Sequence, residues 1–300
     1  MKYEIYGQPA RKHSNGGGLV ALTASVAETA YVGPNAKVCG YAKVYGNAKV
    51  SDNAKVSGNA EVSDNAKVSD NARVYDNARV YSHAMVYGNA RVYGDAMVYG
   101  NAMAYGDAMV YDNAKVYGNA MVCDDAMVYG NAVRYGNAKV YGNAVVYGNA
   151  VVCDDAKVCG NAKVYSHAMV YGNARVYGDA MVYGNARVYG NAVVYDNAKV
   201  YGNAMVYGNA RVYGNAKVYG NAVVSKPQDI AILTINGINI TITKQNAVVG
   251  CQCLEHKEWL DMTGEQALEF GQEYGDLFDF YRPALLQIMN PFMESNNANK

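Results

Sequence analysis

The sequence predicts a mainly β protein, a triangular parallel β-helix of 11–12 coils with 18 residues in each, followed by a small α+β unit. Two observations lead to this fold class. An apolar residue returns at nearly every sixth position through 35 hexapeptides between Val20 and Val224, and the period stops after Pro227. Strands this short cannot bury a face alone, so they are stable only when neighbouring coils stack on them.

Each hexapeptide combines one short strand with one corner. In the unit Val44–Lys49, VYGNAK, alanine and valine alternate with lysine and tyrosine, which is the period-2 pattern of a strand with one buried face. We therefore expect alanine and valine to point inward, and lysine and tyrosine to point outward. The Gly-Asn pair is expected at the corner, because both residues tolerate positive φ.

Two units depart from the pattern of the interior. Ala104 occupies a valine position, where we expect a small void, and Arg134 occupies another. An unpaired guanidinium is costly in an apolar interior. The sequence therefore predicts a local bulge that turns Arg134 outward.

The repeat resembles a known family motif. The unit Val32–Lys37, VGPNAK, resembles the hexapeptide repeat of left-handed parallel β-helix proteins, which place an aliphatic residue first and a small residue fifth. The resemblance covers about two thirds of the chain. It implies left-handed coils, and it implies that the rods trimerise, as they often do in this family. Many family members are acyltransferases. The unit over residues 226–300 resembles C-terminal domains of bacterial and phage hexapeptide-repeat proteins.

Composition excludes several classes of protein. The apolar residues never run for the roughly 18 positions that a membrane-spanning helix needs, and Met1–Lys12 contain no apolar stretch typical of a secretory signal. The six cysteines show neither zinc-ligand spacing nor a disulfide framework. We expect a cytoplasmic protein with reduced thiols, without a membrane partner, a metal or another cofactor.

Both ends of the repeat need a cap, since a β-helix otherwise exposes its terminal edges. The predicted organisation is an N-terminal capping segment over residues 1–19, the β-helix over 20–225 and an α+β cap or interaction domain over 226–300. In the last part, Asn236-Gly237 predicts a hairpin over 230–243, and a third strand is expected over 247–253. The sequence Thr263-Gly264-Glu265-Gln266 predicts a capping box that opens a helix.

The outward positions are expected to form columns of side chains, because residues 18 apart stack on one face. One column contains only tyrosine from Tyr75 to Tyr219, and the column beside it is apolar at its centre. Large exposed aromatic and methionine patches are typical of interaction sites. The predicted binding surface comprises Tyr111, Tyr129, Tyr147, Met109, Met127, Val145, Val133, Val151 and Met169.

A basic stripe precedes this surface, at Lys37, Lys55, Arg73 and Arg91. Residues 1–225 carry 21 basic and 16 acidic side chains, whereas residues 226–300 carry 5 basic and 10 acidic ones. This asymmetry is compatible with a contact between ends or with an anionic partner. It is too small to favour nucleic acid, so solvated charge is the simpler interpretation of the stripe.

The sequence favours a non-enzymatic structural or binding protein that displays its Tyr and Met columns to itself or to another protein, with a trimer favoured among homo-oligomers. The alternative is an acyltransferase that uses a CoA-linked donor, with His83 or His167 as its base. No inserted loop interrupts the repeat to hold such a donor, and the two histidines are expected on different corners. A further alternative is a phage or prophage factor that binds a host component.

Overall fold

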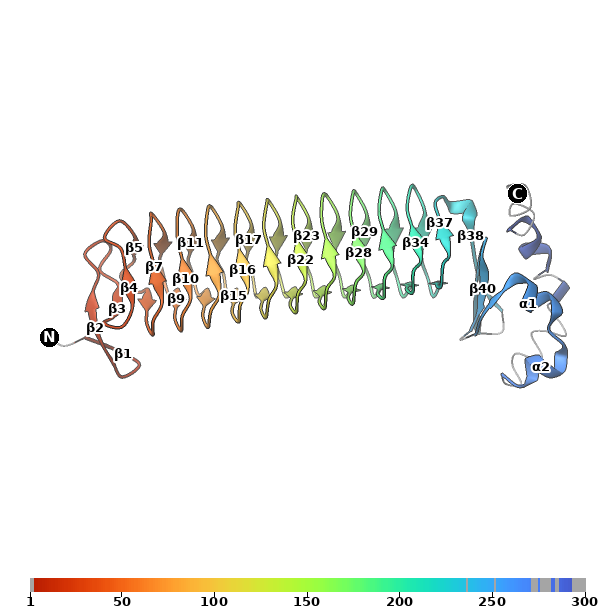
Figure 1. Cartoon of the computed structure of the whole chain (residues 1–300), viewed down its shortest axis with the longest axis horizontal. Coiled ribbons are helices and arrows are strands. Elements are labelled where there is room, and N and C mark those ends of the chain that lie inside the picture. The colour runs from red at the N-terminus through yellow and green to blue at the C-terminus, as the bar shows by residue number, and fades with distance from the viewer. Residues whose placement is uncertain are drawn as a thin grey trace. The chain divides into compact units, whose positions relative to one another are not determined.

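The computed structural model describes residues 3–235, 237–250, 252–270, 275, 282–283 and 286–292. The chain folds into two compact units, Met1–His167 and Ala168–Lys300. Both units contain coils of a parallel β-solenoid, about 11 coils in all, and the second also contains a four-stranded antiparallel sheet and short helices (Figure 1). The predicted mainly β fold, a parallel β-helix with a small C-terminal α+β unit, is confirmed. The left-handed sense of the coils stays a prediction.

In the first unit, each coil contributes one strand to each of three parallel sheets, named here A, B and C. Sheet A contains β3 (Leu19–Ala21), β6 (Lys37–Val38), β9 (Lys55–Val56), β12 (Arg73–Val74), β15 (Arg91–Val92), β18 (Met109–Val110), β21 (Met127–Val128), β24 (Val145–Val146) and β27 (Lys163–Val164). Sheet B contains β4 (Ser25–Val26), β7 (Lys43–Val44), β10 (Glu61–Val62), β13 (Arg79–Val80), β16 (Met97–Val98), β19 (Lys115–Val116), β22 (Val133–Arg134) and β25 (Val151–Val152). Sheet C contains β5 (Tyr31–Val32), β8 (Lys49–Val50), β11 (Lys67–Val68), β14 (Met85–Val86), β17 (Met103–Ala104), β20 (Met121–Val122), β23 (Lys139–Val140) and β26 (Lys157–Val158).

The register of these sheets follows the repeat. Arg73 pairs with Arg91 and Val74 with Val92, so that residues 18 apart lie side by side. The repeat alanines and valines at the inward positions from Ala30 to Val224 are buried, and each buried valine contributes roughly 1.5–3 kcal/mol to stability. The predicted division into inward Ala and Val and outward Lys and Tyr is confirmed.

The two corner residues have separate roles, which the sequence pattern did not distinguish. The first adopts positive φ, as at Gly100 (φ 70°), where an added Cβ would lie 3.0 Å from the backbone nitrogen of Gly118. The second is asparagine in most units, and its side chain donates along the corner. Asn101 Nδ2 lies 3.1 Å from Asn119 Oδ1, and Asn119 Nδ2 lies 3.1 Å from Asn137 Oδ1. The corners therefore contain ladders of amide hydrogen bonds.

The N-terminal segment extends sheet A by an antiparallel hairpin. Strand β1 (Tyr3–Ile5) pairs with β2 (Gln8–Lys12), and β2 pairs with β3. Tyr6 occupies the hairpin turn at a φ of 51°, a conformation that a tyrosine rarely adopts. The turn therefore presents an aromatic ring at a position that usually favours Gly, Asn or Asp.

The predicted outward bulge at Arg134 is wrong. Arg134 is 0% exposed, and it pairs in unbroken register with Val116 and Val152. Its Nη2 donates to Ala138 O at 2.6 Å, whereas Nε and Nη1 have no partner among the described residues. An outward turn would break the ladder on both sides of the strand, so the side chain follows the strand into the interior.

The second unit repeats the three-sheet pattern. One sheet contains β30 (Met181–Val182), β33 (Lys199–Val200) and β36 (Lys217–Val218). Another contains β28 (Met169–Val170), β31 (Arg187–Val188), β34 (Met205–Val206) and β37 (Val223–Val224). The third contains β29 (Arg175–Val176), β32 (Val193–Val194) and β35 (Arg211–Val212).

After these coils the chain forms a small module. It contains the 3₁₀ helix η1 (Pro227–Asp229), the antiparallel strands β38 (Ile230–Ile235), β39 (Ile238–Thr243), β40 (Asn246–Val249) and β41 (Gln252–Glu255), and the helices α1 (His256–Asp261) and α2 (Gly264–Leu268). Residues 286–292 are also helical. The predicted hairpin and the Thr263 capping box are confirmed. The prediction of one third strand over 247–253 is wrong. The chain forms two strands there, β40 and β41, because Gly250 at φ 58° turns it between them.

The module makes hydrogen bonds to the last coils of its own unit. Lys217 donates its backbone N–H to Thr241 Oγ1 at 2.9 Å, and Asn246 Nδ2 donates to Tyr219 O at 3.0 Å. Val223 N donates to the side chain of Gln245 at 3.0 Å. These side chains therefore satisfy backbone groups that no further coil pairs.

Candidate functional site

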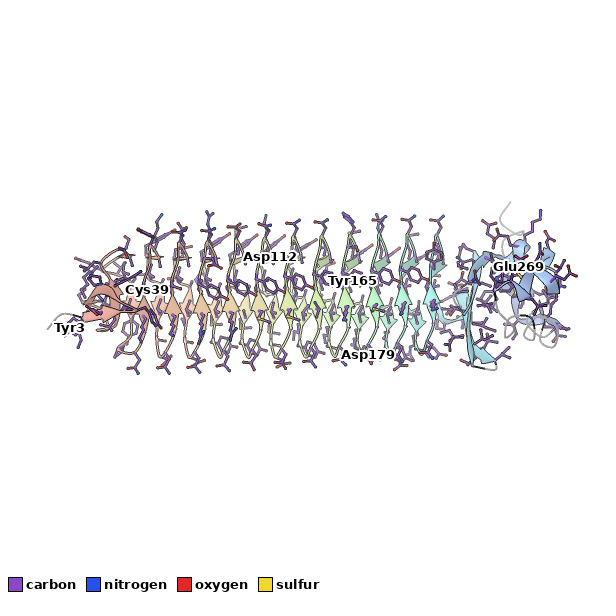
Figure 2. All side chains as sticks on the ribbon, turned by 90° about the horizontal axis from the view of Figure 1, so that it is seen from below. Tyr3, Cys39, Asp112, Tyr165, Asp179 and Glu269 are labelled. Atoms are coloured by element: carbon purple, nitrogen blue, oxygen red, sulfur yellow. The ribbon has the colours of Figure 1, made fainter. Side chains whose placement is uncertain are left out.

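The tyrosine column of the first unit lies at the corner between sheets A and B. Its rings stack with centroids 4.8–5.0 Å apart and planes 2–8° apart, in the order Tyr75, Tyr93, Tyr111, Tyr129, Tyr147 and Tyr165. Figure 2, in which Tyr165 is labelled, shows the side chains that project from the coils. Partial burial and neighbouring tyrosines raise the pKa of Tyr111 to about 12. Tyr111 is therefore neutral at physiological pH, and the stacked rings form a continuous aromatic strip.

Apolar side chains flank this strip on both sheets. Met109 and Met127 lie on sheet A, and Val133 and Val151 on sheet B, all partly exposed. Val145 differs, since it is only 9% exposed. It is a short side chain in a row between the longer Met127 and Lys163. The structure thus groups the predicted surface around one corner of the first unit, except for Met169, which lies on β28 of the second unit.

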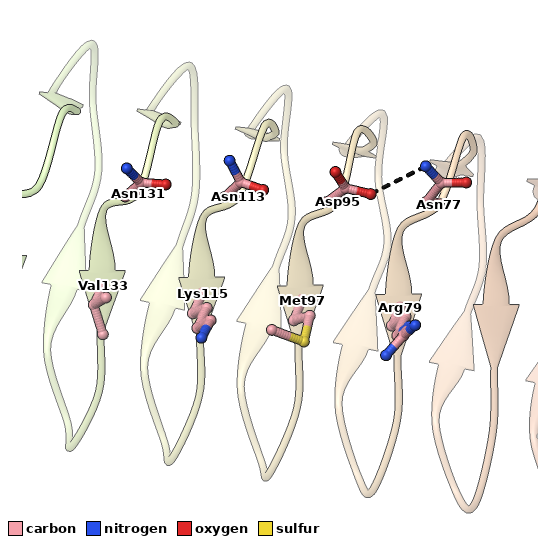
Figure 3. A pocket seen from close by; sticks show the side chains of 8 residues that line it. All are labelled: Asn77, Arg79, Asp95, Met97, Asn113, Lys115, Asn131 and Val133. Atoms are coloured by element: carbon pink, nitrogen blue, oxygen red, sulfur yellow. Dashed lines mark hydrogen bonds between the residues drawn. The ribbon is translucent and has the colours of Figure 1, made fainter.

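A shallow groove of about 500 Å³ runs along sheet B beside the strip (Figure 3). It is lined by Asn77, Arg79, Asp95, Met97, Asn113, Lys115, Asn131 and Val133. One wall is a corner row in which Asn77 Nδ2 donates to Asp95 Oδ1 at 3.0 Å, and the other is the outward row of sheet B. The groove offers amides, one carboxylate, two cations and apolar groups side by side.

The basic stripe is partly covered by the N-terminal hairpin. The Nζ atoms of Lys37 and Lys55 lie 5.4 and 5.1 Å from the ring centroid of Tyr6, within the range of a cation–π contact. Arg73 and Arg91 continue the row and are exposed. No ion pair joins these four cations to any residue within the described ranges.

The two histidines lie on different corners, as predicted. His83 follows β13 of sheet B, and His167 follows β27 of sheet A. Each ring contacts an asparagine of the preceding coil, with Nδ2–Nε2 distances of 3.4 Å to Asn65 and 3.0 Å to Asn149. His83 also lines a groove of about 640 Å³, together with Asn47, Lys49, Asn65, Lys67, Met85 and Asn101.

Cysteine interrupts the other two tyrosine columns of this unit. A side-chain hydrogen bond to Cys153 raises the pKa of Tyr135 to about 12, and a similar bond to Cys123 raises the pKa of Tyr105. Burial raises the pKa of both thiols. Among the described residues the cysteines are free, and the thiols favour their neutral form.

The sequence pattern missed two features of these surfaces. Asparagine at the second corner position was assigned to the turn, although its six-residue recurrence is the signal from which the amide ladders follow. The contact of Tyr6 with Lys37 and Lys55 left no local signal, because it joins segments distant in sequence.

Within the described part of the chain, no group of three or more His, Cys, Asp or Glu side chains has an arrangement that could hold a metal ion. The helices of that part are too short and too polar for any of them to cross a membrane.

The fold and the repeat are those of a hexapeptide-repeat β-helix, and this part of the resemblance drawn from the sequence is confirmed. More particularly, the family model described as "YdcK Beta solenoid repeat" matches eleven segments of the chain. They are residues 66–88, 84–100, 90–104, 122–136, 138–154, 168–184, 174–188, 180–196, 186–200, 198–214 and 210–226. A search of curated proteins finds no match.

Three similar solved structures are described as acyl- or acetyltransferases. An Arabidopsis UDP-N-acetylglucosamine acyltransferase is 15% identical over 61% of this chain and 69% of that chain, with a TM-score of 0.41. A putative acetyltransferase of Desulfovibrio desulfuricans G20 is 9% identical over 85% and 78%, with a TM-score of 0.32. The UDP-N-acetylglucosamine O-acyltransferase of Moraxella catarrhalis RH4 is 12% identical over 92% and 96%, with a TM-score of 0.23.

Proposed function

We propose that the protein is a non-enzymatic binding protein whose first unit docks a macromolecular partner on the Tyr and Met surface around the corner of sheets A and B. The observation that carries this proposal is the unbroken stack of rings from Tyr75 to Tyr165 with Met109, Met127 and Val133 beside it. Aromatic residues and methionine are enriched where proteins bind one another. The first partner we propose is a second copy of the chain, with a trimer as the favoured assembly.

The test is sedimentation at rising protein concentration, with the variant M127K/V133K. Lysine already occupies the same rows at Lys163 and Lys115, so these changes suit the fold. We expect the wild-type chain to self-associate and the variant to associate at least tenfold more weakly. The control M85K/M121K introduces the same two charges on sheet C, in rows where Lys67 and Lys139 are the neighbours, and should leave association unchanged. A wild-type chain that stays monomeric throughout would overturn self-association, and another protein that binds the wild type but not M127K/V133K would then be the partner.

Acyl transfer is the second candidate, because His83 lines a groove with Lys49 and Lys67. A histidine base beside two cations suits an anionic donor such as acetyl-CoA. The experiment is donor hydrolysis or transfer by the full chain and by the variants H83A and H167A. Turnover that H83A abolishes would establish this activity in place of the non-enzymatic role.

A cytoplasmic location, and the origin of the protein as a phage or prophage factor that binds a host component, stay predictions. Capping by residues 1–19 and 226–300 is likewise a proposal, supported by the hairpin of β1 and β2 and by the hydrogen bonds of Thr241 and Asn246.

A further inference from the structure

The C-terminal module carries an apolar groove with an acidic rim, which the proposed function does not use. The groove has a volume of about 300 Å³. It is lined by Leu254, Glu258, Asp261, Met262, Gln266, Glu269 and Phe270. Phe270 is 37% exposed, and the neighbouring Leu268 is 46% exposed. We call these lining residues the acidic groove.

Among the residues that the structure describes, the carboxylates of this groove have no cationic partner. Glu258, Asp261 and Glu269 are exposed, and no ion pair joins any of them to a residue in the described ranges. Glu258 Oε2 accepts a hydrogen bond from Glu255 N at 2.7 Å, which fixes this side chain at the start of α1. Three negative charges around an apolar floor favour a ligand that combines cations with an apolar group.

The opposite combination occurs at the N-terminal hairpin. Tyr6 is 65% exposed, and the ammonium groups of Lys37 and Lys55 lie over its ring. The backbone of Tyr6 adopts a turn conformation that tyrosine rarely takes, so local backbone preference does not explain why a tyrosine stands there. We call these three residues the Tyr6 surface. It offers an aromatic side chain flanked by two positive charges.

We propose that the Tyr6 surface of one copy docks in the acidic groove of a second copy. The ring of Tyr6 would fill the apolar floor between Leu254, Met262 and Phe270, and the two lysines would face the carboxylates. Charge complementarity and the pairing of an exposed ring with an apolar groove support this contact. Each copy of the chain carries one Tyr6 surface and one acidic groove, so one copy can supply the ligand for the groove of another.

Such a contact joins two different surfaces, and therefore does not close on itself as a twofold dimer does. A docked pair retains one free groove and one free Tyr6 surface, so further copies can add and the association continues into a series of oligomers. The contact is small, which predicts weak association. It also depends on charge, so it should weaken as the ionic strength rises from about 0.1 M to 1 M, where the Debye length falls from about 10 Å to 3 Å.

The test uses two full-length variants, each with one surface removed. The variant K37A/K55A removes the cations of the Tyr6 surface, and E258Q/D261N/E269Q neutralises the acidic groove with little change of shape. Gln at position 258 preserves the capping box of α1. Both surface variants also carry the changes M127K/V133K, so that association through the Tyr and Met surface does not contribute. The chain with M127K/V133K alone is called the background chain. The control K139A/K157A removes another stacked lysine pair, on sheet C.

In sedimentation at high concentration and low salt, we expect the background chain and the control to form a series of oligomers. Each surface variant alone should be monomeric, with association weakened at least tenfold. A mixture of the two should form a one-to-one dimer and nothing larger, because it contains one intact surface of each kind. The variant Y6N, which suits the turn, should also lose association.

Other outcomes overturn the proposal. They are a background chain that stays monomeric, surface variants that still form the oligomer series, or a mixture that stays monomeric. A synthetic peptide with a tyrosine between lysines that binds the groove while the chain stays monomeric would assign the groove to another protein. Loss of the oligomer series on addition of M127K/V133K alone would instead support the surface proposed above and reject this contact.

Discussion

The guanidinium of Arg134 donates a hydrogen bond to the carbonyl oxygen of Ala138 at 2.6 Å in the interior of the solenoid. This is the one partner of the group among the described residues, since Nε and Nη1 have none. Burial lowers the pKa of Arg134 to about 9, so the side chain still carries a proton at neutral pH. A charge with incomplete hydrogen bonding therefore lies between Val116 and Val152.

The variant R134V should raise the free energy of unfolding by about 1–4 kcal/mol, because well-packed apolar side chains commonly replace a buried charge with a gain in stability. Urea denaturation followed by circular dichroism measures this change. R91V, at an exposed position of sheet A, is the matched control and should stay within about 0.5 kcal/mol. A loss of stability in R134V would mean that the arginine supports the coil.

The tyrosine strip should contribute to stability whether or not it binds a partner. Y111A removes the stacking contacts with Tyr93 and Tyr129, and should lower the free energy of unfolding by about 0.5–2 kcal/mol. The control Y41A removes an exposed ring that belongs to none of these stacked pairs. Equal losses in the two variants would contradict a stabilising role for the stack.

The protein should lose stability in alkali. Partial burial raises the pKa of Tyr111 and of Tyr201 to about 12, above the ordinary value of 10. Between these values the unfolded chain releases phenolic protons that the folded chain keeps. The stabilisation is therefore complete below pH 10 and is lost as the pH rises through about 12. Tyrosinate absorbance in native and denaturing buffer checks this, and identical titration curves would contradict it.

The cap proposal predicts a cost when one hydrogen bond of the C-terminal module is removed. T241V deprives the backbone N–H of Lys217 of its acceptor, and should lower the free energy of unfolding by about 1–3 kcal/mol. The control T234V removes an exposed hydrogen bond within the same sheet, from Thr234 Oγ1 to Asn239 Oδ1, and leaves the backbone of the coils untouched. If calorimetry finds the two variants equally stable, Thr241 does not protect the end of the coils.

The six-residue period was sufficient to predict the strands, the core and the rows of outward side chains, because valine and alanine at fixed spacing leave one arrangement that buries them. The prediction from the period failed at Arg134. The preference of a charged guanidinium for solvent competes there with the backbone pairing of its strand to the strands on both sides. The period also gave no warning of α1 or of the turn at Gly250, since the module lacks a repeat. The position of Tyr6 over two lysines depends on tertiary structure alone.

The pairing of residues 18 apart, as at Arg73 and Arg91, has a consequence for how such a gene can change length. Loss or gain of eighteen codons would remove or add one whole turn and leave every later side chain on its original sheet. A change of six codons would preserve the core equally well, yet it would pass each later residue to the next sheet and bring unlike rows together. Selection on surface function should therefore favour changes in whole turns, although folding alone would tolerate both.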